Sequence, residues 1–352
     1  MVSSDPAISD IASDVFGRIL DYSKRVDFLT VLLFSEKQKK MISRDNLLIL
    51  PVSSFVKIFI PIKALMYGRS IAKPDLITSQ DPFETGIVGY ILAYIHKIPF
   101  QIQLHTDMWS PAFRRESLKN LARFYVGKIL LPRASCVRVV HAGIKMMLTE
   151  RLGIKENKIT VLPIYVPTSS LQNAPVKDDL HKKYPQFDFI ILMASRLTKE
   201  KNISLALSAM QNVLKEFPNA GLVIVGEGPL HGKLRKLIKE LSLEKNVFIE
   251  SWQADMASYY KTANLFLITS NYEGYGRTII EALSVGLPVI STDVGVAREA
   301  GARVLGGYGR EGVAEVILES IRNPKPGRLS QYPYKNNDHY LQEFKKSLLS
   351  CL

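Results

Sequence analysis

Two glutamates, Glu273 and Glu281, lie close together in the stretch "NYEGYGRTIIEALSVGLPV" at residues 271–289. Carboxylates at this spacing can form an acid/base pair, the polar face of a helix, or a clamp on a ligand. An acid/base pair for glycoside hydrolysis needs carboxyl groups that face each other across a cleft, which one loop and its following helix do not readily provide. Gly274 and Gly276 instead allow the backbone to approach a ligand closely. The stretch therefore favours a clamp on a ligand.

The elements around the two glutamates support this interpretation. "LFLITS" predicts a strand, and "RTIIEALSV" predicts a helix that ends at Gly286 and Pro288. The helix N-terminus would direct backbone N–H groups at phosphate, while each carboxylate accepts hydroxyl groups of a ribose or another sugar. Alternatively, Glu281 is a helix cap and Glu273 a surface charge. That alternative does not explain why glycines and a strand end coincide with them.

Two cations follow another predicted strand. "FIILMAS" ends at Ser195 and is followed by Arg196, and Lys201 comes shortly before a predicted helix. Ligands of open parallel sheets bind beyond the carboxyl ends of the strands. Two cations beside a helix N-terminus there would hold a diphosphate. Taken alone, these two residues fit a solvated loop better.

A third loop partly matches a dinucleotide-binding fingerprint. "LVIVGEGPLHG" supplies Gly226, Gly228 and Gly232, but the third glycine comes one position late and Pro229 lies inside the turn. The expected acidic residue at the end of the next strand is also missing. The stretch therefore predicts a tight turn, and we reject NAD binding.

Short β-rich runs alternate with stretches of helical period along the whole chain, which predicts an α/β fold with parallel sheets covered on both faces. A chain of 352 residues exceeds what one core usually serves, so we expect two domains. The first covers residues 1–167 and the second residues 189–325. Residues 168–188, rich in Pro, Ser, Asn and charge, form the linker, and residues 326–352 contain a final helix.

The net charge of +13 indicates an anionic partner: nucleic acid, acidic lipid or a phosphorylated substrate. No nucleic-acid-binding motif is present, so we expect no nucleic acid partner. Residues 55–69 and 113–133 interleave cations with large apolar residues, as suits a surface resting on acidic lipid. A solvated helix that buries its other face is the alternative for either segment. Because both lie in one half of the chain, membrane contact is favoured.

Compartment signals point to the cytoplasm. Cys136 and Cys351 cannot make a disulfide framework and lack metal-ligand spacing, which indicates a reducing compartment. The start "MVSSDPAISD" has no signal-peptide pattern. The apolar run "GIVGYILAYI" falls short of the ~20 residues that cross a bilayer. We expect a cytoplasmic protein, soluble or peripheral on the inner face of the cytoplasmic membrane.

Four segments, in order, resemble the retaining glycosyltransferases of family 4, which have the GT-B fold: "ASRLTKEKN", "LVIVGEGPL", "NVFIESW" and "YYKTANLFLITSNYEGYGRTIIEALSVGLPVISTDVG". The resemblance is close over residues 189–295 and loose over residues 75–166. It implies two Rossmann-like, doubly wound domains that face a cleft. The first (1–167) would be the acceptor side, the second (189–325) would bind the donor nucleotide sugar, and the final helix (326–352) would cross back to the first domain.

The resemblance also implies roles for individual residues. Arg196 and Lys201 would hold the donor diphosphate, Glu281 the ribose hydroxyls, and Glu273 the hydroxyls of the transferred sugar. The resemblance also places His105 near the donor sugar. The implied catalytic residues are His105, Glu273, Arg196 and Lys201. The remaining donor contacts implied are the backbone of Gly274, Tyr275, Gly276 and Arg277 near the phosphates, and Trp252 and Gln253 near the nucleobase.

The implied reaction moves a hexose from a nucleotide diphosphate donor, a UDP-sugar or GDP-mannose, to a lipid-linked or saccharide acceptor in glycan or cell-envelope polysaccharide biosynthesis. No metal or cofactor is expected, since cations and helix amides stabilise the leaving nucleoside diphosphate. The acceptor hydroxyl would attack from the leaving-group face, with a donor phosphate oxygen as the base. The anomeric configuration would thereby be retained.

The start of the chain departs from the family's pattern. A GT-B chain opens with a strand, normally central in its sheet, and a glycine-rich loop. Here "MVSSDPAISDIASDVFGRILDYSKRV" resembles the helix after that strand. We therefore expect the first domain to lack its first strand, which suggests a truncated chain, a wrong start site or an impaired enzyme. A sugar-nucleotide epimerase and a truncated, inactive nucleotide-sugar-binding protein remain as alternative functions.

Overall fold

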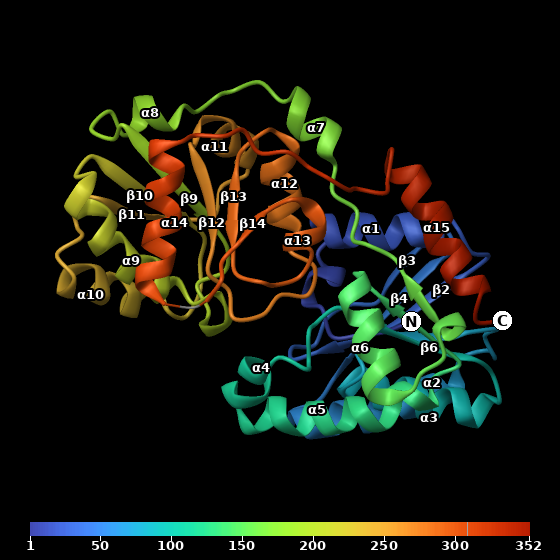
Figure 1. The fold of residues 1–352 in the computed structure, drawn as a ribbon. Coiled ribbons are helices and arrows are strands. Elements are labelled where there is room, and N and C mark those ends of the chain that lie inside the picture. The colour runs from blue at the N-terminus through green and yellow to red at the C-terminus, as the bar shows by residue number, and fades with distance from the viewer. Residues whose placement is uncertain (308) are drawn as a thin grey trace. The chain divides into compact units, whose positions relative to one another are not determined.

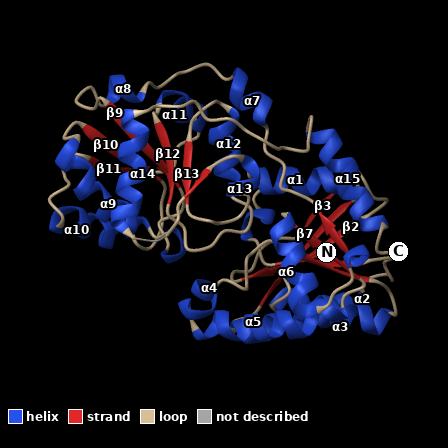
Figure 2. Ribbon diagram, in the orientation of Figure 1, coloured by secondary structure: helices blue, strands red, loops and turns tan. Residues whose placement is uncertain are grey.

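The structure, a computed structural model, describes residues 1–307 and 309–352 (Figure 1). The chain divides into two compact units, and each contains one sheet with helices around it (Figure 2). The predicted α/β class with two Rossmann-like domains is therefore confirmed. The first unit comprises Met1–Trp109, Ser117–Tyr165 and Tyr334–Leu352, and the second comprises Ser110–Glu116 and Val166–Pro333.

The first unit is built on an eight-stranded sheet with the order β3-β4-β2-β1-β5-β6-β7-β8. Its strands run parallel except β3, which pairs antiparallel with β4. The strands are β1 (Val2–Ser3), β2 (Leu29–Ser35), β3 (Ile42–Arg44), β4 (Leu47–Ser53), β5 (Ile77–Ser79), β6 (Phe100–Leu104), β7 (Cys136–Val139) and β8 (Ile159–Val161).

The expectation that the first strand is missing is wrong. Val2 pairs with Leu32 of β2 and with Ser79 of β5, so β1 lies in the middle of the sheet. This strand is only two residues long and has no apolar run of its own, which is why periodicity does not reveal it. A 3-10 helix (Pro6–Ser9) follows, and the predicted helix in the opening segment is α1 (Asp14–Ser23).

Helices cover the first sheet. Among them α2 contacts α3, α3 contacts α5, and α1 contacts the last helix, α15. Within the described part of the chain, no helix combines the length and apolarity needed to span a bilayer. The helices of this unit are α1, α2 (Ile60–Ser70), α3 (Glu84–His96), α5 (Leu118–Leu130), α6 (Ala142–Leu152) and α15 (Asn337–Leu349).

Helix α15 packs on the first sheet through a polar and aromatic contact set. The Arg138 guanidinium of β7 is almost fully buried, donates to the Tyr340 hydroxyl over 3.1 Å and lies 5.4 Å from the centre of the Phe344 ring. The Gln101 amide of β6 donates to the Ser347 carbonyl over 2.8 Å. A buried cation without these contacts would be costly, so they fix the helix on the sheet.

A disulfide adds a covalent link between the same elements. Cys136 of β7 is bonded to Cys351, which follows α15, and their Cα atoms are 5.4 Å apart. The residues are 215 positions apart in the sequence, so their spacing could not reveal the pair. Because disulfides persist in oxidising environments, these cysteines no longer support the predicted reducing compartment.

The second unit contains a six-stranded parallel sheet with the order β11-β10-β9-β12-β13-β14. The strands are β9 (Phe189–Ala194), β10 (Ala220–Val225), β11 (Val247–Glu250), β12 (Leu265–Ile268), β13 (Val289–Ser291) and β14 (Arg303–Val304). The helices are α4 (Pro111–Glu116), α7 (Thr168–Asn173), α8 (Leu180–Lys183), α9 (Ile203–Glu216), α10 (His231–Glu240), α11 (Met256–Thr262), α12 (Arg277–Ser284), α13 (Ala297–Ala300) and α14 (Arg310–Arg322).

The core of the second unit explains why its strands are apolar on both faces. Ile191 and Leu192 point to opposite sides of β9, and both are fully buried. Helix α9 buries a stripe that includes Ala206, Met210 and Val213. Strands covered on both sides are nearly continuous apolar runs, and this property made "FIILMAS", "AGLVIVG" and "LFLITS" recognisable.

Two features of the second unit differ from the predicted organisation. The segment expected to be a plain linker, 168–188, contains the short helices α7 and α8. Helix α4, which comes from between β6 and α5, belongs to the second unit although its flanking elements belong to the first. Helix α8 has a local signal, since Asp179 caps it by accepting from the His181 N–H over 2.9 Å. The unit to which α4 belongs has no such signal, because it depends on where the segment packs.

We predict that Cys351→Ala lowers the free energy of unfolding under non-reducing conditions by about 2–5 kcal/mol, because the crosslink restricts the unfolded chain. Thermal or urea unfolding with and without dithiothreitol measures this effect. Reductant should lower the stability of the wild type to that of the variant and leave the variant unchanged. Mass spectrometry that finds two free thiols in the oxidised, native protein would contradict the prediction.

Candidate functional site

The candidate site is built on two neighbouring strands of the second unit. Strands β9 and β12 pair in parallel, so the loops that follow them leave the same edge of the sheet. Hydrogen bonds join these loops directly. The Asn271 backbone N–H donates to the Glu200 backbone carbonyl over 2.7 Å, and the Thr269 hydroxyl donates to the Asn202 backbone carbonyl over 3.0 Å. The cations after β9 and the first glutamate after β12 are thereby brought together.

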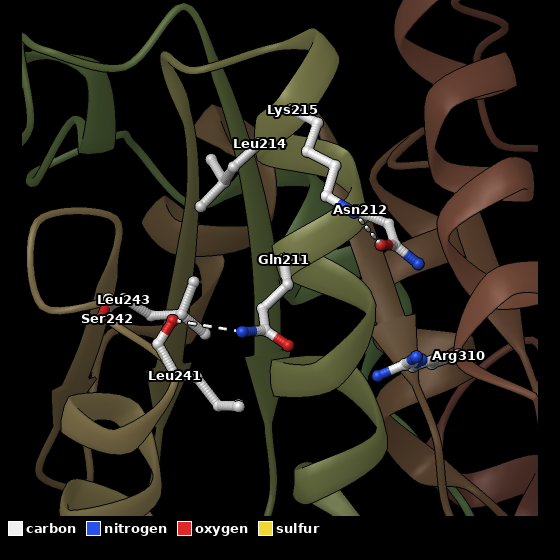
Figure 3. A pocket seen from close by; sticks show the side chains of 8 residues that line it. All are labelled: Gln211, Asn212, Leu214, Lys215, Leu241, Ser242, Leu243 and Arg310. Atoms are coloured by element: carbon white, nitrogen blue, oxygen red, sulfur yellow. Dashed lines mark hydrogen bonds between the residues drawn. The ribbon is translucent and has the colours of Figure 1, made fainter.

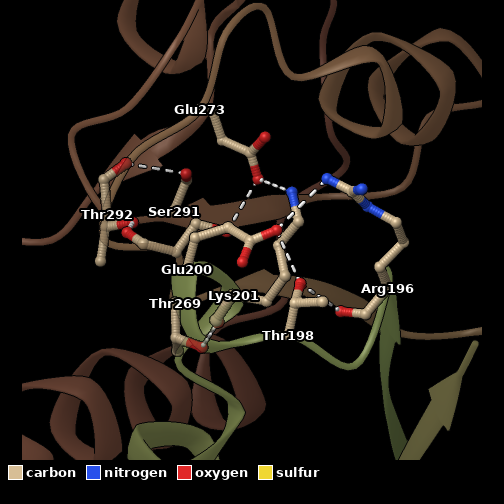
Figure 4. A network of polar contacts seen from close by, with 9 residues as sticks. Arg196, Thr198, Glu200, Lys201, Thr269, Glu273, Ser291 and Thr292 are labelled. Carbon is tan, nitrogen blue, oxygen red and sulfur yellow. Dashed lines mark hydrogen bonds and ion pairs between the residues drawn. The ribbon is translucent and has the colours of Figure 1, made fainter. Parts of the chain in front are cut away.

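Lys201 and Glu273 form the central contact of this site (Figure 4). The Lys201 Nζ lies 2.6 Å from the Glu273 Oε1, and the two side chains are only 14% and 17% exposed. The Ser270 hydroxyl donates to the same carboxylate oxygen over 2.8 Å. Glu273 is therefore an enclosed, paired carboxylate and not a free surface charge.

Arg196 belongs to the same polar network but is far more exposed. Its guanidinium lies 3.3 Å from Glu200 Oε1, and its side chain is 77% exposed, compared with 12% for Glu200 (Figure 4). The Thr198 hydroxyl also donates to Glu200, over 2.6 Å. An exposed guanidinium with one weak partner can move to meet an anionic ligand, whereas Lys201 is held in place.

The glycine-containing loop after β12 leads into the uncapped N-terminus of α12. Gly276 has a φ of 90°, which favours glycine, and no side chain caps the helix there. The first backbone N–H groups of α12 therefore lack intrahelical partners and carry the positive end of the helix dipole. Tyr275 and Arg277 flank this point, with the Tyr275 ring buried. The helix N-terminus is chemically suited to an anion.

Glu281 lies one turn into α12 and is held by two side chains. Its Oε2 accepts a 2.9 Å hydrogen bond from the Tyr260 hydroxyl, and its Oε1 lies 3.6 Å from the Arg277 guanidinium. Burial, with the neighbouring carboxylate, raises the pKa of Tyr260, so this tyrosine stays a hydrogen-bond donor. Glu281 is thus not a helix cap. A carboxylate has about four acceptor positions, so it retains capacity for ligand hydroxyls.

The two residues predicted to meet a nucleobase, Trp252 and Gln253, lie in the loop after β11. Trp252 is 70% exposed in the loop after β11. The Gln253 amide donates to the Ser251 carbonyl over 3.3 Å. Among the residues that the structure describes, neither side chain has a hydrogen bond to the network around Lys201. The structure therefore does not join this loop to the other predicted contacts.

Two glycines of the partial dinucleotide fingerprint support the loop that carries the cations. A Cβ atom on Gly226 would lie 1.9 Å from the Ser195 carbonyl oxygen, and one on Gly228 would lie 2.5 Å from that of Leu197. Neither distance leaves room for a side chain. These glycines let the loop after β10 pack against the loop that contains Arg196.

Helix α4 supports the loop that carries Glu273, and sequence reasoning missed it. The Tyr272 hydroxyl donates to the Glu116 carboxylate, and the Phe113 ring lies edge-on to the Tyr272 ring with centroids 5.6 Å apart. Burial, followed by the contact with Glu116, raises the pKa of Tyr272. The two segments are 156 residues apart, and no local pattern announces the contact.

His105 belongs to the first unit, where it follows β6. Its Nε2 lies 3.2 Å from Gln103 Oε1. Burial, with the nearby charges of Arg138 and Arg18, lowers its pKa to about 3, so the imidazole is neutral at pH 7. His141, which sequence reasoning missed, follows the neighbouring strand β7, and burial lowers its pKa to about 4. The same signal, a histidine just after a strand, would have found it.

A pocket elsewhere on the second unit is unrelated to this site (Figure 3). Its lining comes from α9, the turn after α10 and the start of α14, with no residue from the loops after β9 or β12. The Gln211 amide there donates to the Leu241 carbonyl over 3.3 Å. The pocket therefore does not change the assignment of the candidate site to the carboxyl ends of the strands.

Two family models match the two halves of the chain. "Glycosyl transferases group 1" matches residues 176–303, and "Glycosyltransferase Family 4" matches residues 41–170. The first of these ranges contains every predicted donor-site residue of the second unit. The second contains His105.

Individual proteins give the same result. An uncharacterised glycosyltransferase of Methanocaldococcus jannaschii is 30% identical over 281 residues, which cover 76% of this chain and 65% of that protein. An alpha-monoglucosyldiacylglycerol synthase of Streptococcus pneumoniae is 26% identical over 70% of this chain and 59% of its own length. The match thus spans less than two thirds of either relative.

A solved structure, that of Anabaena HepE in complex with UDP-glucose, has the same fold. It superposes with a TM-score of 0.69 at 18% identity, covering 99% of this chain and 93% of that one. The superposition covers both units described above. The family models and the relatives confirm that the chain belongs to glycosyltransferase family 4, and the solved structure confirms the GT-B fold.

Proposed function

We propose that this protein is a retaining glycosyltransferase that moves a hexose from a nucleotide diphosphate donor to a lipid-linked or saccharide acceptor in glycan or cell-envelope biosynthesis. The observation that carries this proposal is the enclosed Lys201–Glu273 ion pair beside the uncapped N-terminus of α12. A cation and free backbone amides suit a diphosphate. A fixed carboxylate next to them suits the hydroxyls of the attached sugar.

Each cation proposed to meet the donor phosphates already has one carboxylate partner. The pairs are Arg196–Glu200, Lys201–Glu273 and Arg277–Glu281. The exposed Arg196 exchanges its partner for phosphate at little cost, because exposed pairs contribute little. Lys201 keeps Glu273 and directs its remaining N–H donors at the diphosphate. Glu273 and Glu281 accept the sugar and ribose hydroxyls through their carboxylate oxygens.

The proposed chemistry needs no metal and no cofactor. Lys201, Arg196 and the amides at the start of α12 stabilise the charge that develops on the leaving nucleoside diphosphate. The acceptor hydroxyl attacks from the leaving-group side, and a donor phosphate oxygen takes its proton. His105, neutral at pH 7, acts as a hydrogen-bonding group near the donor sugar. Retention of the anomeric configuration follows from attack on that face.

The substrate classes are supported by the relatives. HepE was solved with UDP-glucose, and the pneumococcal relative makes monoglucosyldiacylglycerol. We therefore propose a UDP-sugar as the donor, with GDP-mannose as the second candidate, and a lipid acceptor before a soluble saccharide. A lipid acceptor requires the enzyme to work at a membrane surface as a peripheral protein.

We predict that UDP raises the thermal unfolding temperature of the wild type more than GDP or ADP does, and that Glu281→Ala reduces this shift because the ribose loses its carboxylate. Differential scanning fluorimetry measures both effects. Glu240→Ala is the matched control, since Glu240 also has a cation, Lys236, four positions away on an exposed helix. Equal UDP shifts in the wild type and both variants would show that Glu281 does not contact the ribose.

We predict that Lys201→Ala lowers kcat/KM for transfer by roughly 100-fold or more, the cost typical of removing one group that stabilises developing charge. Arg196→Ala should cost less, because Arg196 is largely exposed to solvent. Lys199→Ala, an exposed lysine on the same loop, is the control and should keep wild-type activity. Activity of Lys201→Ala within threefold of wild type, roughly 0.6 kcal/mol, would rule out the proposed role.

We predict that the product keeps the anomeric configuration of the donor, which proton NMR of the initial product resolves. An inverted product would exclude the retaining mechanism. The same assay without acceptor separates the alternatives: a changed donor sugar would indicate an epimerase. Donor binding without any turnover, with either acceptor class, would indicate a nucleotide-sugar-binding protein.

A further inference from the structure

One face of the first unit exposes many large apolar side chains. It is formed by α2 with the segment before it, by α3 and by α5, and we call it the α2–α5 face. The exposed fraction of these side chains ranges from 37% for Leu121 to 108% for Phe55. The apolar residues are Phe55, Val56, Ile58, Phe59, Ile62, Met66, Tyr67, Ile87, Tyr94, Ile95, Leu118, Leu121, Tyr125 and Ile129.

The exposed residues follow helical spacing and are not scattered. On α5, Leu118 is followed by Leu121, Tyr125 and Ile129, which fall on one side of the helix. A different side of α5 buries Phe124 against the unit. This helix is therefore apolar on its outer side as well as on its inner side. A contiguous exposed apolar surface indicates an interaction site.

A second stripe of the same kind runs along α2. Ile58, Ile62 and Met66 are spaced by four residues, and they are 75%, 53% and 66% exposed. Helix α3 contacts both α2 and α5, so the stripes belong to one layer of helices (Figure 1). Tyr94 of α3, 78% exposed, adds to the apolar surface between them.

Cations accompany these stripes, while acidic residues are scarce. Residues 55–74 and 117–149 contain no Asp or Glu. Lys57 and Lys119 pair with single glutamates from neighbouring segments, Glu36 and Glu84. Exposed cations of the same segments with no ion pair in the described part of the chain are Lys63, Arg69, Lys73, Lys128 and Arg133.

We propose that the α2–α5 face docks on an anionic phospholipid bilayer. Apolar side chains enter the boundary between headgroups and acyl chains, and the surrounding cations attract acidic headgroups. A second copy of this chain fits less well, because a symmetric contact would set the same cations against each other. This inference extends the proposed lipid acceptor, but it rests on the surface alone and does not depend on the transfer chemistry.

Vesicle sedimentation of the full chain tests the proposal. The wild type should bind vesicles of phosphatidylcholine with phosphatidylglycerol at least about tenfold more tightly than phosphatidylcholine alone, and added salt should weaken the binding. Ile58→Ser with Leu118→Ser should weaken binding to the mixed vesicles at least about tenfold, because both apolar stripes are interrupted. Lys63→Gln with Lys128→Gln should remove the preference for acidic lipid.

The control is Val176→Ser with Lys239→Gln, an exposed apolar residue and an exposed lysine of the second unit, which should bind vesicles like the wild type. Unchanged vesicle binding by the Ile58→Ser, Leu118→Ser variant would overturn the proposal. So would equal affinity for both lipid mixtures, or a wild-type dimer in light scattering that these substitutions dissociate.

The UDP-induced thermal shift keeps this test separate from the proposed function. The three double variants made for the vesicle experiments should retain the wild-type shift, which also shows that they are folded. Vesicle binding without any nucleotide shift would leave the membrane inference standing and remove the proposed donor chemistry. A nucleotide shift without vesicle binding would overturn the membrane inference and leave the proposed donor chemistry standing.

Discussion

The candidate site depends on the ion pair between Lys201 and Glu273. These residues are 72 positions apart, and their contact joins the loops after β9 and β12 at one edge of the second sheet. Both side chains are largely enclosed, so removing either would leave the other charge with little solvent and without its oppositely charged partner. The pair therefore shapes the site and couples the positions of its two members.

Around this enclosed pair the site combines an exposed charge with one that is held by neighbouring side chains. Arg196 is exposed and has one weak partner, while Glu281 is held by the buried Tyr260. Carboxylates that are already positioned lose little freedom when they accept a sugar hydroxyl. In the proposed function, the exposed guanidinium of Arg196 and the uncapped start of α12 would supply the positive charge that a diphosphate needs. This division suits a ligand with one anionic and two hydroxyl-rich parts.

In the first unit, helix α15 is packed against the sheet, whereas the α2–α5 face is exposed. Helix α15 is fixed by the buried Arg138, the Tyr340 hydroxyl and the Cys136–Cys351 disulfide, so those contacts are satisfied inside the unit. On the α2–α5 face, by contrast, apolar side chains remain in water although each helix also buries an inner side. The energetic cost of exposing them is consistent with a partner that covers them.

The sequence by itself determined the local part of this description. Apolar runs and glycines placed Arg196, Lys201, Glu273 and Glu281 after strands and at a helix start, because strand–loop–helix order is encoded by neighbouring residues. Only the tertiary structure decided that β1 completes the first sheet, that Cys136 meets Cys351, and that α4 supports Tyr272. Those contacts join segments far apart in the chain, and periodicity carries no information about which distant segments pack together.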